Sequence, residues 1–410
     1  MKIEDWDWVG ERMIGPFEEQ NVSAEAGATG TLLALGVERR VLRACLLEPI
    51  AGHHRLIGWI SVQRDPGSEL THQLAIVCRR LGARLGRPLW DEAEDAPFIA
   101  SKDPLRYPPI DQVLAASTPR DLLRVWIAGL SPQDSIAAAR TAANAAPARV
   151  VGVTALDATI DIAELARRFS ADRPDILVVT GGYDNPDPNT ERPIYQLTGI
   201  MCELLRRLPP GERPAIVYAG DRWMAPYCVD RLQAVSDTLL VEVVANLRPS
   251  PTLLHTAPLA SMLTERQWDL AQRMPGFIRL GRWVTKPARI MSMEANFTQA
   301  TRAWMEVERL SSIHGLYFAS NWRLHVLAEA GSETVRMRYV EERTLDPQLA
   351  GWPPVTLVSG LPPGDALRLA PRWWDRSGML PVVASVGQLA PEAMIHTMRH
   401  DLLAEQVNEI

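Results

Sequence analysis

LLRVWIAGL, residues 122–130, is the first of five apolar stretches that decide the fold of this chain. The other four are RVVGVTAL (149–156), DILVVTGG (175–182), PAIVYAG (214–220) and TLLVEVVAN (238–246). Near-continuous runs of Val, Ile and Leu are typical of strands that are buried on both faces. The segments between them carry apolar residues at helical spacing, and this alternation predicts a parallel sheet covered by helices on both sides. We therefore expect a Rossmann-like, doubly wound α/β domain over residues 119–248.

The carboxyl edge of this sheet is the candidate binding site, because ligands bind beyond the carboxyl ends of the strands in doubly wound folds. The loop after the third strand combines paired glycines, which permit close backbone approach, with side chains that bind hydroxyl groups or a metal ion. The loop after the fourth strand adds a glycine and a carboxylate. The candidate ligand-binding residues at this edge are Ser131, Gly181, Gly182, Asp184, Asn185, Gly220 and Asp221.

Each of these loops also has a purely structural interpretation. Tight turns from strand to helix need glycine whether or not a ligand is bound, and Asp221 is also a suitable helix N-cap. Ser131 and Pro132 are expected to open a helix as its N-cap and its first residue, and this helix should run to about Ala146. The N–H groups at its start form either a simple cap or an anion site.

The regions on either side of the Rossmann-like domain show different patterns. Apolar strands are expected over residues 31–50 and 54–62, with a turn at 51–54 between them, and a helix over 71–85. Strands return from Ile313, separated by turns at Ser320-Asn321 and Gly331-Ser332. The expected division is an irregular arm (1–28), a first subdomain (29–118), the Rossmann-like domain (119–248), a bundle-like helical connector (249–312), and a second subdomain with a mixed C-terminal region (313–410).

Composition limits the functional classes. A formal net charge of −6 provides no general attraction to nucleic acid or anionic membrane. No GxxxxGK[ST] string is present, and no run of eighteen apolar residues predicts a membrane span. The four cysteines are scattered without a CxxC pair, so we expect reduced structural thiols, no metal site and a cytoplasmic protein.

The central segments resemble the glutamate mutase L family. The resemblance rests on RVWIAGLSPQDSIAAARTAANAAPARVVGV (124–153), RPDILVVTGGYDN (173–185), RPAIVYAGDR (213–222) and VEVVANLRP (241–249), and it extends over roughly residues 31 to 340. It implies an actin-like ATPase scaffold, ribonuclease H-like in fold, into which the Rossmann-like domain is inserted. It also implies an association with an adenosylcobalamin-dependent mutase. Where the family typically has GGTDGG, this chain keeps both glycines and Asp184 but has Tyr183 and Asn185-Pro186, which stiffen the loop.

The two phosphate loops implied by the resemblance are degenerate. The family's first loop is a DxGSTxTK-like string, whereas residues 34–43 read ALGVERRVLR and retain only Gly36. Its second, DxGGATTD-like, corresponds to residues 317–325, YFASNWRLH, which lack both aspartate and the glycine pair. Such aspartates hold the metal and position the attacking water, so their loss should abolish hydrolysis. Glu38 either restores a carboxylate at the first loop, or Arg39 and Arg40 beside it neutralise it or bind an anion. Glu38 joins Gly36 among the candidate ligand-binding residues.

Three functions are compatible with this sequence. The leading hypothesis is a pseudo-ATPase without catalytic residues that acts as an accessory, scaffold or regulatory subunit on a protein partner, either a cobalamin-dependent mutase or a related paralogue. No cofactor is expected in this case. The second is an ATP-dependent reactivating factor, which would bind ATP and Mg²⁺. The third is a small-molecule binding protein that uses the Rossmann-like domain.

Overall fold

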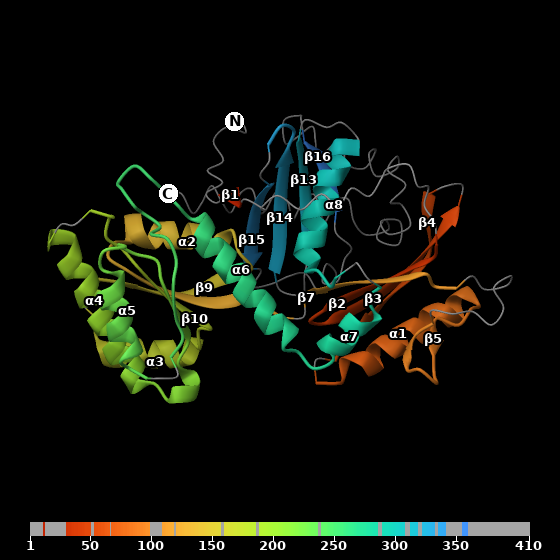
Figure 1. Ribbon diagram of the computed structural model, residues 1–410, viewed down its shortest axis with the longest axis horizontal. Helices are drawn as coiled ribbons and strands as arrows, with labels where there is room; N and C mark the ends of the chain where they lie inside the picture. The colour runs from red at the N-terminus through yellow and green to blue at the C-terminus, as the bar shows by residue number, and fades with distance from the viewer. Residues whose placement is uncertain are drawn as a thin grey trace.

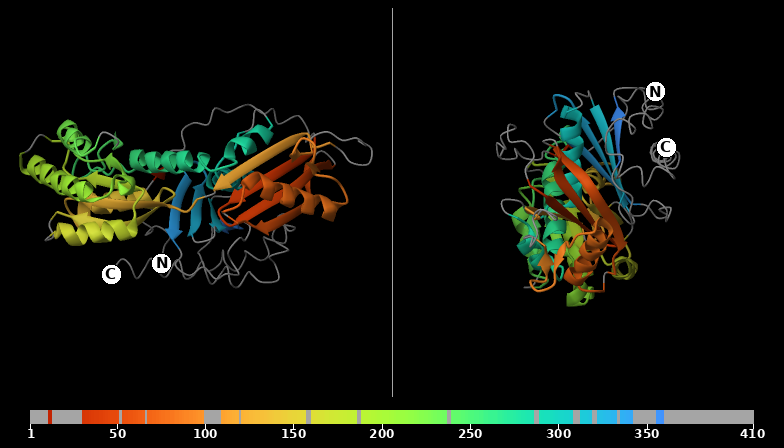
Figure 2. Two further views of the ribbon diagram at one scale, coloured as in Figure 1. Left: turned by 90° about the horizontal axis from the view of Figure 1, so that it is seen from below. Right: turned by 90° about the vertical axis from the view of Figure 1, so that its right-hand side faces the viewer.

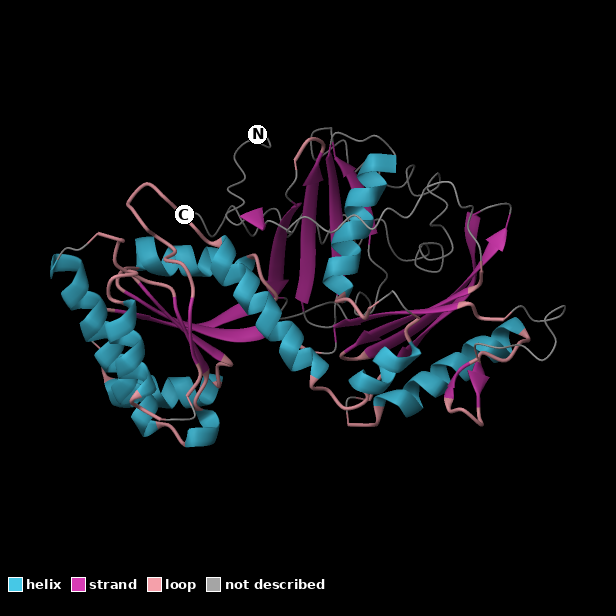
Figure 3. Cartoon of the chain, in the orientation of Figure 1, coloured by secondary structure: helices cyan, strands magenta, loops and turns pink. Residues whose placement is uncertain are grey.

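The computed structural model contains three main sheets, each packed against its own helices (Figure 1). Figure 3 shows the helices and strands separately from the loops. The structure describes residues 11–12, 30–50, 53–65, 67–98, 109–118, 120–156, 160–185, 188–236, 239–285, 289–307, 312–318, 322–332, 335–341 and 355–359. Most of the expected N-terminal arm and most of the C-terminal region lie outside these residues, as does the Ser320-Asn321 turn.

The first sheet has the strand order β4-β3-β2-β7. β2, β3 and β4 form an antiparallel meander, and β7 pairs with β2 in parallel. This order and direction, with a helix between β4 and β7, is the ribonuclease H-like arrangement. The elements are β2 (Leu32–Glu38), β3 (Val41–Ile50), β4 (His53–Gln63), α1 (Leu70–Leu85), the small hairpin β5 (Trp90–Asp91) and β6 (Ala96–Pro97), and β7 (Gln112–Thr118). His53 and His54, expected in a turn, instead begin β4.

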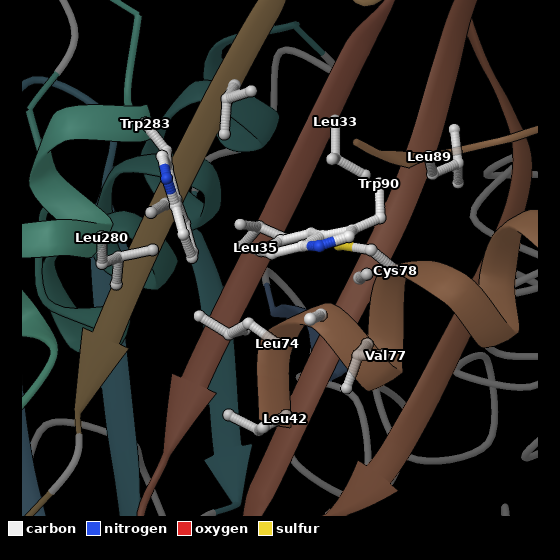
Figure 4. Packing of buried hydrophobic residues seen from close by; sticks show 14 of the residues in the cluster. Leu33, Leu35, Leu42, Leu74, Val77, Cys78, Leu89, Trp90, Leu280 and Trp283 are labelled. Carbon is white, nitrogen blue, oxygen red and sulfur yellow. The ribbon is translucent and has the colours of Figure 1, made fainter. Parts of the chain in front are cut away.

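The two faces of the first sheet meet different surroundings because side chains alternate along a strand. Leu33, Leu35 and Val37 of β2 are buried in a core with α1 and with α7 (Phe277–Trp283). Figure 4 shows this core, in which Trp90 and Trp283 meet edge to face with ring centroids 5.2 Å apart. The opposite face of β2 carries Gly36 and Glu38, which therefore point away from this core.

The second sheet is parallel and has the strand order β12-β11-β10-β8-β9. Numbered within the domain, this is the doubly wound order 2-1-3-4-5, with the switch point between β8 and β10. All five predicted strands and all four predicted helices are present. They are β8 (Leu123–Gly129), η2 (Pro132–Ile136), α2 (Ala137–Asn144), β9 (Ala148–Ala155), α3 (Ile162–Asp172), β10 (Ile176–Thr180), α4 (Pro188–Arg207), the short η3 (Pro210–Glu212), β11 (Ala215–Tyr218), α5 (Ala225–Gln233) and β12 (Val241–Val243).

Helices cover both faces of the parallel sheet. One face packs against α3, α4 and α5 through residues such as Phe169, Met201 and Leu232. The other packs against α2 and against α6 (Ala257–Gln272), whose Leu259 and Leu263 are fully buried. Figure 1 shows α6 and α2 on the same side of the parallel sheet, and Figure 2 (left) shows this domain and the first sheet at opposite ends of the molecule.

The third sheet has the order β1-β15-β14-β13-β16 and is antiparallel throughout. Its β13-β14-β15 meander repeats the β2-β3-β4 meander of the first sheet, but β16 runs antiparallel to β13, whereas β7 runs parallel to β2. The predicted turn at Gly331 is present, with a φ of +80°. The strands are β1 (Glu11–Arg12), β13 (Ser312–Phe318), β14 (Trp322–Glu329), β15 (Val335–Glu341) and β16 (Val355–Ser359).

The predicted helical connector does not form a bundle. Its three helices each cover a different sheet: α6 the parallel sheet, α7 the first sheet, and α8 (Met293–Val307) the third sheet. Each helix has an apolar face, and each of these faces is buried against strands. The whole is an α/β protein in which a ribonuclease H-like scaffold carries a doubly wound parallel-sheet domain as an insertion. No helix in the described part of the chain has the length and apolar character that crossing a membrane requires.

Candidate functional site

The glycines predicted at the carboxyl edge of the parallel sheet serve close packing between loops. Gly181 and Gly182 have φ values of +136° and +79°, which favour glycine. A Cβ added at Gly181 would lie 2.4 Å from Leu130 Cγ, and one added at Gly220 would lie 2.7 Å from the Gly181 carbonyl oxygen. The loops after β8, β10 and β11 therefore touch one another directly.

Asp184 connects three loops at this edge. Its Oδ1 accepts hydrogen bonds from the Arg222 backbone N–H at 3.0 Å and from Asn246 Nδ2 at 2.9 Å. Asn246 Nδ2 also donates to the Gly182 carbonyl at 3.0 Å. Asn246 was not among the predicted residues, although it directly follows the fifth strand and the rule that identified the other loops applies to it as well.

Asp134, Tyr183 and Arg248 form a second contact across the switch point between β8 and β10. The Tyr183 hydroxyl donates to Asp134 Oδ2 at 3.0 Å, and Arg248 Nε forms an ion pair with Asp134 Oδ1 at 2.7 Å. Burial raises the pKa of Tyr183, and its hydrogen bond to Asp134 raises it further. The loop that differs from the family pattern at Tyr183 is thus fixed to the start of η2.

Asp221 lies beneath these loops and is fully buried. Its Oδ1 accepts the Trp223 backbone N–H at 2.8 Å, as a helix N-cap would, but its Oδ2 has no hydrogen-bond partner among the described residues. Burial raises the pKa of Asp221, and the charges of Asp184 and Glu191 add to this effect. An unpaired buried carboxylate oxygen is costly and calls for a proton or a ligand.

Two predicted residues have different roles from those expected. Ser131 precedes η2, and Pro132 is the first helical residue as predicted, but the Ser131 side chain makes no capping hydrogen bond. Instead, Ser135 Oγ accepts the backbone N–H groups of Leu130 at 3.0 Å and Ser131 at 3.2 Å, because a π-helical first turn brings it there. Asn185 is exposed at the end of its loop.

Gly36 and Glu38 lie on the other candidate site, the face of the first sheet that points away from its core. Gly36 is opposite Arg43 in the β2-β3 hairpin, and a Cβ there would lie 3.7 Å from Met293 Cε. Glu38 is 4% exposed and forms an ion pair with Arg43, and its carbonyl accepts Arg64 NH1 at 3.0 Å. The carboxylate at the first loop is therefore neutralised by an arginine of the same hairpin.

Buried polar side chains continue from Glu38 into the third sheet. Tyr317 of β13 is 1% exposed, and burial raises its pKa well above the ordinary value, with the charge of Glu38 as the next cause. Glu294 at the start of α8 accepts a hydrogen bond from Thr118 Oγ1 at the end of β7. Between the two ribonuclease H-like meanders there is thus a compact polar cluster comprising Glu38, Arg43, Thr118, Glu294 and Tyr317.

All four cysteines are free thiols, and Cys78, Cys202 and Cys228 are buried. Burial raises the pKa of Cys45 to about 11 and that of Cys78 to about 12, so both are protonated near neutrality.

Comparison with known families identifies the chain. Residues 80–302 match the family described as MutL protein, and this stretch is more than half of the chain. The chain belongs to the MutL family. The match confirms the glutamate mutase L resemblance for the Rossmann-like domain and the helices that follow it. The hairpin with Gly36 and Glu38 and the strands from β13 onward lie outside the matched residues of this MutL-family protein.

Solved structures offer only distant likenesses. RuvC of T. thermophilus, solved with a Holliday junction substrate, is 11% identical, with a TM-score of 0.13 over 58% of this chain and 95% of its own. The Ppx/GppA phosphatase of Aquifex aeolicus is 11% identical, with a TM-score of 0.14 over 46% and 67%. The ethanolamine utilization protein EutJ from Carboxydothermus hydrogenoformans is 13% identical, with a TM-score of 0.14 over 58% and 90%. No curated protein matches the chain.

Proposed function

We propose that this MutL-family protein is an accessory subunit that acts on a partner protein and does not hydrolyse ATP. One observation carries the proposal: Glu38, the only carboxylate in residues 34–43, where the first phosphate loop is expected, is buried in an ion pair with Arg43. A carboxylate engaged in this way is not available to hold a hydrated metal ion.

The surroundings of the hairpin support the same proposal. Met293 packs toward Gly36, and the buried ring of Tyr317 lies by Glu38 and Arg43. Side chains in these positions would hinder phosphate groups from approaching the hairpin backbone. The family match does not extend to this hairpin, which fits a segment that no longer serves nucleotide binding.

The test is calorimetry with ATP and Mg²⁺ on the full chain, together with a phosphate-release assay. We expect neither binding nor turnover. A Glu38→Gln variant serves as the control for any residual activity, because it removes the charge while keeping the shape of the side chain. Turnover that is present in the wild-type protein and absent in Glu38→Gln would overturn the proposal and support the ATP-dependent reactivating factor instead.

The partner follows from family membership and needs its own test. MutL here denotes glutamate mutase L, so an adenosylcobalamin-dependent mutase is the partner that we propose. Size-exclusion chromatography of the purified protein with such a mutase should show a complex whose amount is the same with and without ATP. A complex that forms only with ATP would contradict the nucleotide-independent role.

A further inference from the structure

The buried Oδ2 of Asp221 marks a site that the accessory function does not use. Asp221 is fully buried, and its Oδ1 is already occupied by the Trp223 N–H. The Oδ2 lies 3.7 Å from the position that a Cβ would take at Gly182, so it lies beside the Gly181–Asp184 loop. A buried carboxylate oxygen without a partner is rare in a folded protein.

The groups around this oxygen increase the negative charge. Asp184 and Glu191 are close enough to act electrostatically on Asp221, and none of the three forms an ion pair with a described side chain. The nearby arginines are engaged elsewhere: Arg248 pairs with Asp134, and the guanidinium of Arg222 lies over the Trp223 ring, 4.8 Å from its centroid. Along the described part of the chain, therefore, the cluster lacks a protein cation.

We propose that this edge of the parallel sheet binds one divalent metal cation, held by the carboxylates of Asp221 and Asp184. Asp184 is held in place for this role, since its Oδ1 is fixed by the Arg222 N–H and by Asn246 Nδ2. The Gly182 carbonyl accepts from the same Asn246 Nδ2 and is a third oxygen beside Asp184. Gly182 has a φ of +79°, and its backbone packs closely on Asp221, since a Cβ there would lie 3.0 Å from Asp221 Cβ.

The donor atoms indicate the class of metal. Carboxylate and carbonyl oxygens favour Mg²⁺ or Ca²⁺, and no thiolate or imidazole in this cluster favours zinc or copper. In the described residues no three Asp, Glu, His or Cys side chains converge closely enough to hold an ion alone. Because Asp221 is fully buried, water could complete the coordination of a cation only from the side of the half-buried Asp184.

The experiment is a titration of the metal-free full-length protein with MgCl₂ or CaCl₂, followed by calorimetry and by thermal unfolding. The variants are Asp221→Asn and Asp184→Asn, with Asp230→Asn as the matched control. Asp230 is an exposed carboxylate on α5 that forms no ion pair with a described residue, and its replacement changes the net charge equally. KCl at the same ionic strength controls for general screening.

We expect one ion bound per chain at millimolar concentration or below, and a Tm that rises with either chloride in the wild-type protein and in Asp230→Asn. Binding should weaken at least tenfold in Asp221→Asn and Asp184→Asn. Metal-free Asp221→Asn should unfold at a temperature no lower than the metal-free wild type, because the unpaired buried charge has gone.

Three results would overturn the proposal: no ion bound to the wild type, equal binding by Asp221→Asn and Asp230→Asn, or the same rise in Tm with KCl. The first would leave a protonated Asp221 as the explanation of the unpartnered oxygen. These titrations contain no nucleotide, so they are independent of the ATP experiment and can fail or succeed separately from it.

Discussion

At the scale of single residues, Trp126 and Gly152 show how the parallel sheet accommodates its largest side chain. They are paired on β8 and β9, and the indole Nε1 donates to Thr154 Oγ1 at 2.9 Å. The ring is fully buried against Phe169. A Cβ built at Gly152 would lie 2.2 Å from a ring carbon of Trp126, so only glycine leaves room for the indole.

The Gly152→Ala variant should therefore be overpacked and destabilised by about 1–3 kcal/mol. Urea unfolding followed by tryptophan fluorescence measures the change. Gly211→Ala is the matched control, because a Cβ at Gly211 meets nothing within 4 Å. Equal stability of the two variants would show that Trp126 can move aside at little cost.

Glu294 is the residue that should make stability depend on pH. Burial raises the pKa of its carboxyl from the ordinary value of 4.5, and the charge of Glu38 acts in the same direction. The folded state therefore binds the proton more tightly than the unfolded state. This contribution to stability is fully present below pH 4.5 and is lost as the pH rises through the folded pKa.

In the Glu294→Gln variant no carboxyl group titrates at this position, so the loss of stability at higher pH should disappear. The amide oxygen of the glutamine can still accept the hydrogen bond from Thr118. We expect the Tm of Glu294→Gln minus that of the wild type to increase between pH 5 and pH 8. The difference in Tm between Glu265→Gln, a change at an exposed position of α6, and the wild type should not change with pH. Parallel curves for all three proteins would contradict the role of Glu294.

At the scale of secondary-structure elements, the helices of residues 257–307 show what periodicity predicts and what it leaves open. Helical spacing of apolar residues indicated that this region is helical, which the structure confirms. The same spacing contains no information about which sheet an apolar face will cover. The three helices therefore do not pack together as the expected bundle, and each packs on a different sheet.

Replacing one buried leucine in each of two helices tests these separate contacts. Leu263→Ala in α6 and Leu280→Ala in α7 each remove a fully buried side chain and should cost about 2–5 kcal/mol. Hydrogen exchange should accelerate in β8, β10 and α2 for Leu263→Ala, and in β2 and α1 for Leu280→Ala. Acceleration in the same segments for both variants would indicate one shared core.

The candidate site was predictable where it follows from strand order and hidden where it depends on tertiary contacts. Asp184 and Asp221 were found because both follow buried parallel strands. Asn246 obeys the same rule, and its signal was the polar residue directly after the fifth strand. Arg43 could not be assigned to Glu38 from sequence, because Arg39 and Arg40 are closer in the chain and the hairpin register decides the pairing.

At the scale of the whole molecule, the inserted domain is attached to the scaffold through β7. The chain leaves the first sheet at the end of β7 and returns beside it: the Ser117 N–H donates to the Met291 carbonyl at 2.8 Å, and the Thr285 N–H donates to that of Val113 at 3.0 Å. Two widely separated parts of the chain thus meet on one strand. Residues 120–272 contain the parallel sheet and the helices on both its faces.

A fragment of residues 120–273 should therefore fold alone, whereas a fragment of residues 120–248 should not. The shorter fragment lacks α6, so the apolar face that packs on Leu259 and Leu263 would be exposed to water. Circular dichroism and cooperative thermal unfolding distinguish the two. A cooperative transition of equal midpoint in both fragments would show that α6 adds little to the domain.

The attachment at β7 also bears on how this chain can have arisen. The chain leaves the first sheet and returns to it at neighbouring points on β7. The hydrogen bonds of the scaffold sheet are therefore the same whichever domain is inserted between these two points. A gene encoding the scaffold could gain, lose or exchange this domain by recombination at two sites without a new strand pairing. Relatives that keep the β2-β3-β4-β7 sheet but carry a different domain at this point, or none, are the expected descendants of such exchanges.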